Sequence, residues 1–382
     1  MQNDKLLFEM NIPNSRKRLR LDVNRGCIVY KSNHAIIDQY DIRDILMFIN
    51  CIHQQFKNIR VPISFEFGKI TFIDKLTYII FEIVCYVLIC DYKHDVFVKF
   101  DCNKSIITEG IESSPLLLLT TGEKQHLEKF IKKFKYELYR RHYRRLLTQE
   151  DMHGDKLSQI MDDITYFLKN FNVTEESIND LAEVIIELIG NVHEHTSTDC
   201  LVDLDVTQQY NKVDSEGVFY GINITVINFS SELFYEPLKR KLFLERNEWD
   251  DRYLKVLQAF DKHKQFFDDK YREEDFFNIA SFQHKISGNA NKNATGGTGL
   301  TKLICSLEKR SDMHMCYMTS GKRILNFIYE YMEYNEENWI GFNAEKNFFL
   351  AKPDIRNFST NAFYLPGTAY NLNFIMERKG KD

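Results

Sequence analysis

The sequence predicts an α+β fold in which a mostly antiparallel sheet carries helices on one face and a smaller α/β domain comes first. Residues 61–100 run from a β-rich stretch through an apolar helix into a second strand pattern, which is typical of a βαβ-like unit. Residues 157–170 and 178–195 show helical periodicity, and strand patterns follow at 201–208 and 218–227. This grouping of helices and then strands favours an antiparallel sheet.

Composition bounds the class of protein. The chain has 382 residues, of which 44% are hydrophobic and 27% charged, so two or three soluble globular domains are expected. The net charge of -5 gives no basic field that would recruit nucleic acid. The longest apolar run, residues 76–90, is interrupted by Glu82 and is shorter than the ~20 residues of a membrane helix, so it predicts a buried helix and no membrane span. Eight cysteines without a CxxC pair, and a start without a secretory signal, favour a cytoplasmic protein with free thiols.

The first 115 residues contain "ITFID" followed directly by the apolar helix. This arrangement resembles the STAS domains, the anti-anti-sigma-factor family, in which a loop after a central strand carries a phosphorylatable serine and leads into a helix. Lys75 follows Asp74 where that family usually has its serine. The resemblance implies a STAS-like domain over residues 1–115 that is not phosphorylated at this position.

Residues 116–150 are basic and aromatic, with nine Lys and Arg between Lys124 and Arg145. We expect a helical connector whose basic face is solvated. The alternative is a helix that follows a phosphate backbone or meets an acidic partner. No nucleic-acid-binding motif stands beside the segment, so nucleic acid is the disfavoured partner.

The stretch "ELIGNVHEH", residues 187–195, places polar groups at regular intervals in a largely apolar helix. Apolar residues at helical spacing predict one buried face: Ile178, Leu181, Ile185, Leu188, Ile189 and Val192. A second stripe repeats every four residues: Glu183, Glu187, Asn191 and His195. This stripe is either a solvated face or one side of a binding site.

A glycine-rich turn follows about a hundred residues later, in "NATGGTGLTKLI", residues 293–304. Gly296, Gly297 and Gly299 allow a sharp turn and a close approach of the backbone to a ligand. The helix that begins near Leu300 offers unpaired N–H groups and the positive end of its dipole. The turn therefore predicts a phosphate cradle, with a plain connection as the alternative.

Together the two stretches resemble the GHKL ATPases, the fold of gyrase B, MutL, the histidine kinases and the anti-sigma-factor serine kinases. The resemblance implies a C-terminal Bergerat-type α/β sandwich over residues 151–382 that binds ATP with Mg²⁺. Glu187 would be the general base that activates a water, and the amide oxygen of Asn191 would be a magnesium ligand. The resemblance implies that further residues contact the nucleotide: His195, Gly296, Gly297, Thr298, Gly299 and Leu300.

The region that would read the base departs from the family pattern. The strand "GVFYGINITVI" ends in "NFS", so Asn228 replaces the family's aspartate and Ser230 its glycine. An amide can accept a hydrogen bond from the adenine amino group, but it can also rotate to donate, which predicts modest selectivity for ATP over GTP. In "PGTAYNLNFIM", Thr368 matches a position that often lies near the base.

The charged stretch between the two glycine boxes is expected to be a helical insertion over about residues 231–285, with "HKISGNANKN" as a mobile lid. A helix at 299–309 and strands near 314–319, 323–332 and 369–376 complete the prediction.

The resemblance implies an ATP-binding, Mg²⁺-dependent ATP-hydrolysing regulatory protein of a bacterial signalling or defence system, with a protein partner or a second copy of the chain. Two alternatives stay open at this point. One is a serine/threonine kinase of the anti-sigma type that acts on a STAS-like partner. The other is a nucleotide-binding module with little turnover.

Overall fold

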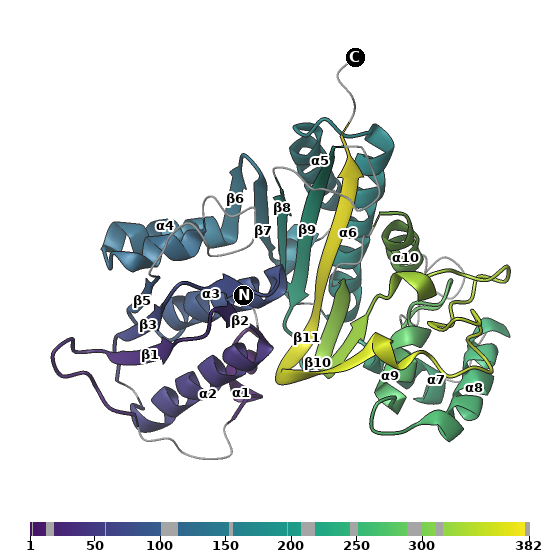
Figure 1. Cartoon of the computed structure of the whole chain (residues 1–382), viewed down its shortest axis with the longest axis horizontal. Coiled ribbons are helices and arrows are strands. Elements are labelled where there is room, and N and C mark those ends of the chain that lie inside the picture. The colour runs from purple at the N-terminus through teal and green to yellow at the C-terminus, as the bar shows by residue number, and fades with distance from the viewer. Residues whose placement is uncertain are drawn as a thin grey trace.

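A six-stranded antiparallel sheet forms the centre of the fold (Figure 1). Its strand order is β10-β11-β9-β8-β7-β6. The strands are β6 Tyr136–Tyr139, β7 His142–Leu147, β8 Cys200–Val206, β9 Phe219–Asn228, β10 Tyr317–Asn326 and β11 Phe358–Glu377. The computed structural model describes residues 1, 3–12, 19–57, 59–100, 114–152, 156–196, 198–207, 218–244, 251–288, 299–310 and 316–378. The predicted α+β class is confirmed.

Three helices cover one face of this sheet: α5 Lys156–Lys169, α6 Glu175–Thr196 and α10 Gly299–Arg310 (Figure 1). The hydroxyl of Thr174 accepts a hydrogen bond from the backbone N–H of Ser177, which satisfies one of the free donors at the start of α6. The whole predicted apolar face of α6 is buried, and it packs with Val202 and Leu204 of β8 in one core cluster. The helical spacing in the sequence therefore predicted the correct buried face.

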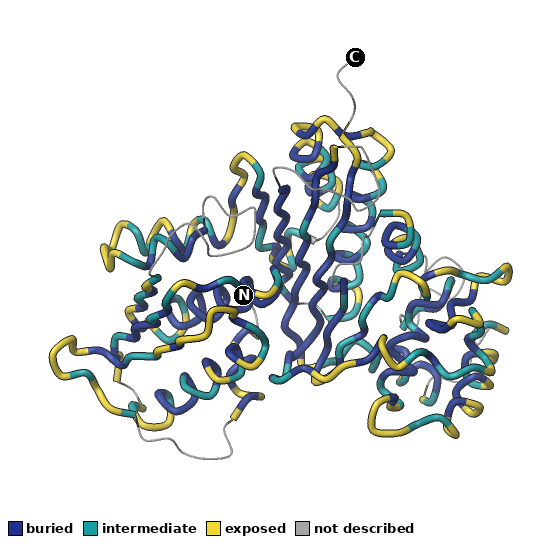
Figure 2. The backbone as a smooth tube through the Cα atoms, in the orientation of Figure 1, coloured by how far each residue is buried: buried dark blue, intermediate teal, exposed yellow. Residues whose placement is uncertain are grey.

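The opposite face of the sheet is covered by the N-terminal lobe, which comprises α1 Leu6–Glu9, α2 Gln39–Gln55, α3 Lys75–Cys90 and five short strands. β1 Ile28–Ser32, β3 Ile63–Phe67 and β5 Val96–Lys99 form a parallel sheet, and β2 Ile36–Ile37 pairs with β4 Thr71–Phe72. Leu201 and Ile227 of the central sheet share a core cluster with the residues of α3. The central sheet is thus buried on both faces, as the dark blue central strands of Figure 2 show.

Helix α3 is the predicted core helix, and it is buried from Lys75 to Ile89. Its first turn is capped by Asp74, whose carboxylate accepts from the backbone N–H of Thr77 at 2.8 Å. Within the described part of the chain, no helix combines the length and the apolar character needed to cross a membrane.

The basic segment 116–150 departs from the expected helical connector. After the 3₁₀ turn η1 Pro115–Thr120, helix α4 extends only over Lys124–Lys135, and the chain then forms β6 and β7. The helical prediction is wrong for residues 136–147 because β7 pairs along its length with β8 and is largely buried. The charges that suggested a solvated face include Arg144, which is fully buried.

The predicted insertion is helical and lies beside the β10 edge of the sheet (Figure 1). It contains α7 Glu236–Leu244, α8 Asp251–His263 and α9 Glu273–Ala280. Arg323 of β10 donates to the carboxylate of Asp275 in α9 at 2.8 and 2.5 Å, and both side chains are buried. This charged pair fixes the insertion to the sheet. The two strands predicted near 314–319 and 323–332 are one irregular strand, β10.

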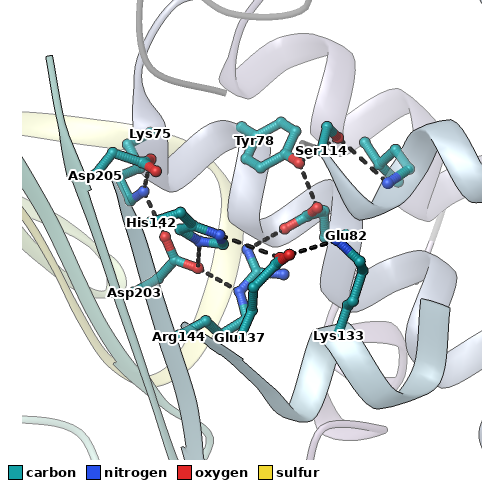
Figure 3. Close-up of polar contacts among 11 residues, drawn as sticks. Lys75, Tyr78, Glu82, Ser114, Lys133, Glu137, His142, Arg144, Asp203 and Asp205 are labelled. Atoms are coloured by element: carbon teal, nitrogen blue, oxygen red, sulfur yellow. Dashed lines mark hydrogen bonds and ion pairs between the residues drawn. The ribbon is translucent and has the colours of Figure 1, made fainter. Parts of the chain in front are cut away.

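A network of buried charges joins the lobe to the central sheet (Figure 3). Its centre is Asp203 of β8, which is fully buried and forms ion pairs with Lys75 of α3 and Arg144 of β7. The ring Nε2 of His142 lies 2.9 Å from the Asp203 carboxylate, and Lys75 also pairs with Asp205. The network therefore links α3 to two neighbouring strands of the sheet.

The same network continues into the lobe through Glu82. Arg144 donates to Glu82, and the Glu82 carboxylate also accepts from the hydroxyl of Tyr78. Tyr78 in turn lies 2.5 Å from the hydroxyl of Ser114. On the other side, Glu137 lies 3.3 Å from the ring of His142, and it accepts from Lys133. The buried charges thus occur in partnered sets, as desolvated ions require.

The charge of His142 depends on its two aspartate neighbours. Burial opposes protonation of its ring, but the carboxylates of Asp203 and Asp205 outweigh burial and raise the pKa of His142 to about 9. Burial likewise opposes ionisation of Asp203, yet the surrounding cations hold its pKa well below the ordinary value. His142 is therefore a cation at neutral pH.

We predict that the stability of the protein falls between about pH 7 and pH 10 because His142 loses its proton there. A histidine whose pKa is raised on folding stabilises the fold fully below its unfolded pKa, and this contribution is lost as the pH rises through about 9. His142→Gln should lower the free energy of unfolding at pH 6 by about 1–3 kcal/mol. The difference between the two proteins, measured by urea unfolding at each pH, should shrink towards pH 10. A constant difference across this range would contradict the assignment.

Candidate functional site

A cavity lies beside the C-terminal half of α6. It encloses about 1110 Å³ of space outside protein atoms, part of which is open solvent at its mouth. Seven of the predicted site residues line it: Glu187, Asn191, His195, Asn228, Gly299, Leu300 and Thr368. The other three, Gly296, Gly297 and Thr298, lie outside the described residues. Two motifs about a hundred residues apart in sequence therefore meet at one cavity.

Glu187 and Gly299 are in direct contact at the floor of the cavity. A Cβ atom added to Gly299 would lie 2.9 Å from Cδ of Glu187 and closer still to its Oε2, so a larger residue would require the Glu187 carboxylate to move from this position. Gly299 is the first residue of α10, and its backbone does not need a positive φ. We expected glycine to serve the turn and an approaching ligand, whereas at this position it accommodates Glu187.

The start of α10 is electrically positive. Its first N–H groups have no helical acceptor, and the helix dipole adds partial positive charge at this end. Lys302 donates to Glu183 at 2.8 Å, and this hydrogen bond raises the pKa of Lys302, so its ammonium is charged one turn into the helix. The helix start itself favours an anionic group, and the carboxylate of Glu187 already lies against it.

Asn191 supplies an unsatisfied polar atom to the same end. It lies one helical turn after Glu187, and its side-chain Nδ2 is buried with no hydrogen-bond partner among the described residues. Buried polar atoms in folded proteins nearly always have a partner, so this N–H donor beside a cavity points to an acceptor at this position, such as an anionic ligand or a water.

The other end of the cavity is formed where β9 and β11 lie side by side. Asn228 is the last residue of β9 and is paired in register with Thr368 of β11. The preceding residue, Gly367, has φ of +87°, and a Cβ there would lie 2.5 Å from the carbonyl oxygen of Asn228. Glycine at this position lets β11 approach the end of β9 closely. The hydroxyl of Ser230 accepts from the backbone N–H of Glu232 at 3.0 Å and forms the turn that follows.

An apolar wall connects the two ends of the cavity, and the sequence prediction missed it. It includes Leu233, Phe234, Pro237, Leu238, Ile286 and Tyr370. The rings of Phe234 and Tyr370 meet edge to face at 6.4 Å. Tyr370 was detectable, because it lies two residues after Thr368 and hence on the same face of a strand. The residues from the insertion carried no signal in the sequence.

The insertion also anchors the segment that leads to the glycine-rich turn. The hydroxyl of Tyr253 in α8 donates to the carbonyl oxygen of Ser287 at 3.0 Å, and Lys241 of α7 donates to the same oxygen at 3.1 Å. Ser287 lines the cavity. The start of the expected lid, residues 284–288, is thus held by the insertion, and the rest of it, from residue 289 to 293, lies outside the described residues.

A second cluster, formed by His142, Asp203 and Asp205, has ligand atoms spaced as in a metal site, but its negative charge is already neutralised by neighbouring side chains. Potential ligand atoms of His142, Asp203 and Asp205 lie within 4.8 Å of one another. The ammonium of Lys75 pairs with both aspartates, where a cation would otherwise sit. Counted with Arg144, Lys133, Glu82 and Glu137, the network has as many cations as anions when His142 is protonated. This cluster is a structural network and not a metal centre.

Comparisons with known proteins give no relative. No protein-family model, curated protein or solved structure matches the chain. Any proposal about the function of this chain must therefore be argued from the residues that line the cavity.

We predict that Gly299→Ala destabilises the protein only when Glu187 is present. The added methyl group would displace the Glu187 carboxylate, and such overpacking typically costs about 1–3 kcal/mol. In a Glu187→Ala background the space is free, so the same substitution should cost little. Urea unfolding of the parent, both single variants and the double variant measures this coupling. Equal costs in both backgrounds would show that the two residues are not in contact.

Proposed function

We propose that this chain binds ATP with Mg²⁺ in the cavity and hydrolyses it, as a GHKL-type ATPase whose C-terminal part is a Bergerat-type sandwich. The observation that carries the proposal is the direct contact between Glu187 and Gly299, the key positions of two motifs that are remote in sequence. The alternative of a solvated stripe does not explain why Glu187, Asn191 and His195 all line one cavity.

The phosphates would lie at the α10 end. The N–H groups of Gly299 and Leu300, which have no acceptor within the helix, would donate to phosphate oxygens, and the helix dipole would stabilise their negative charge. Glu187 would accept a proton from a water that attacks the terminal phosphorus. Its contact with the start of α10 would set the carboxylate beside the proposed phosphate position.

The residues at this end also fit a magnesium ion. The oxygen of a carboxamide is a hard ligand that Mg²⁺ accepts, and the Asn191 side chain lines this end of the cavity, while its Nδ2, a donor without a partner among the described residues, would face a phosphate or water oxygen. When bound, the ion would neutralise charge on the phosphates. The chain would contribute this one neutral ligand, leaving the other positions to phosphate and water, as magnesium sites commonly do.

The base would lie at the β9 and β11 end. Phe234 and Tyr370 offer apolar and aromatic surface to a planar ring, and Asn228 and Thr368 offer polar groups at its edge. Such a division between apolar walls and a few polar groups is usual for ligand pockets.

We further propose a regulatory role in which the cavity and the N-terminal lobe communicate with a protein partner or a second copy. The lobe packs on the sheet face opposite α6. Lys75, at the position of the serine in STAS domains, is buried in the charge network and does not line the cavity. The lobe of the same chain is therefore not placed to receive phosphate, which favours hydrolysis over self-phosphorylation.

The direct test is calorimetry of the full chain with a non-hydrolysable ATP analogue, with and without Mg²⁺. We expect Mg²⁺ to strengthen binding in the parent and to have a smaller effect in Asn191→Leu, which keeps the volume of the side chain but removes its oxygen. Absence of binding in the parent would overturn the proposal. Binding of the analogue, combined with no release of phosphate from ATP itself, would support the nucleotide-binding module in place of the ATPase.

We predict that Glu187→Gln lowers the rate of phosphate release by about 10²–10⁴-fold while the affinity for ATP is nearly unchanged. A general base acts in the transition state, and glutamine keeps the shape of the side chain without its basicity. Single-turnover hydrolysis and equilibrium binding give the two quantities. Turnover at the parental rate would remove Glu187 from the mechanism.

A further inference from the structure

We propose that Thr196 and Thr198 set the base selectivity of the cavity by fixing the side-chain amide of Asn228 with its oxygen towards the ligand. This inference rests on the proposed nucleotide site and specifies which bases it accepts. The sequence alone predicted an amide that could rotate and therefore modest selectivity. The contacts around Asn228 argue for a fixed amide.

The direction of the hydrogen bonds follows from the proton of Thr196. Its hydroxyl donates to the backbone carbonyl of Val192, one turn earlier in α6, at 2.8 Å. Because a hydroxyl has one proton, Thr196 cannot donate to anything else. Its oxygen lies 2.9 Å from that of Thr198, so Thr198 is the donor in this pair. Both hydroxyl protons are thereby used, and both oxygens have only lone pairs left.

Asn228 meets these two oxygens with its amide nitrogen. Nδ2 lies 3.3 Å from the oxygen of Thr196 and 3.2 Å from that of Thr198, and because these oxygens are only 2.9 Å apart, one N–H proton is shared between them. In the reversed orientation the amide oxygen would face the lone pairs of Thr196, and the shared hydrogen bond from Nδ2 would be lost. Asn228 is 1% exposed, so water cannot compensate. The amide is therefore held in one orientation.

The oxygen of Asn228 is then the atom that can meet a ligand. Asn228 lines the cavity, and no described residue donates to its Oδ1. A fixed acceptor favours a base that presents an amino group at its edge, as adenine does. A base with a carbonyl in the same place, as in hypoxanthine or guanine, would bring two acceptors together. A site that loses such a hydrogen bond discriminates on the order of 10–100-fold.

The experiment compares the binding of ATP and inosine triphosphate, which differ at the amino group. The Glu187→Gln protein is used for all measurements, so that hydrolysis does not interfere. We expect at least about 10-fold tighter binding of ATP in this protein. Adding Thr198→Val removes the donor to Thr196 and one acceptor for Asn228, so the ratio should fall to a few-fold. Asn228→Ala, which removes the acceptor itself, should bring the ratio close to one.

Thr225→Val is the matched control. Thr225 is a buried threonine on the same strand, three residues before Asn228, and its hydroxyl has no hydrogen-bond partner among the described residues. This variant should keep the full preference for ATP. Thermal unfolding of each variant identifies any loss of ratio that comes from misfolding.

The outcomes separate the inference from the proposed function. If the Glu187→Gln protein, with Thr198 and Asn228 unchanged, binds the two triphosphates equally, the inference is overturned but the nucleotide site remains. An unchanged ratio in folded Asn228→Ala or Thr198→Val would also overturn it, because other residues would then read the base. Failure to bind either triphosphate would overturn the proposed function itself.

Discussion

The buried carboxylate of Asp203 is the interaction on which the architecture depends. A sheet that is covered on both faces has no solvated side for a charged residue, yet β8 carries Asp203 and Asp205 in buried positions. Their charges are tolerable only because β7 and α3 bring cations against them. The same ion pairs therefore hold β7 in the sheet and the N-terminal lobe on its outer face.

This constraint also explains which parts of the fold the sequence could predict. The buried face of α6 followed from helical spacing, whereas a shared site for Glu187 and Gly299 was expected from the resemblance of the two motifs to GHKL ATPases. Periodicity reports which side of an element is buried, and these elements bury apolar side chains. The strand β7 was missed because its buried Arg144 reads as a surface residue until its partners, Glu82 and Asp203, are known.

In the cavity, too, residues within short sequence motifs could be predicted, whereas residues brought in from distant parts of the chain could not. Residues on α6 and at the start of α10 were predictable because each motif is contiguous in sequence. The wall formed by Phe234 and Ile286 depends on how the insertion folds back on the sheet, and no local pattern encodes that. The orientation of Asn228 depends on hydroxyl groups more than thirty positions away in Thr196 and thirty away in Thr198. Such an arrangement becomes visible only with the backbone in place.

The start of α3 shows how far the lobe and the sheet have become one unit. The backbone N–H of Leu76 donates to the side chain of Asn371 in β11 at 3.2 Å, and the hydroxyl of Tyr317 in β10 donates to Asp74 at 2.8 Å. A helix whose first turn is bonded to strands 243 and 295 residues later in the chain cannot be excised intact. Separated from the sheet, Lys75 and Glu82 would lie on an apolar helix with no opposite charge to meet them. The lobe is therefore not expected to fold as an independent domain. Transferring it into another protein would require its partner strands to be transferred with it.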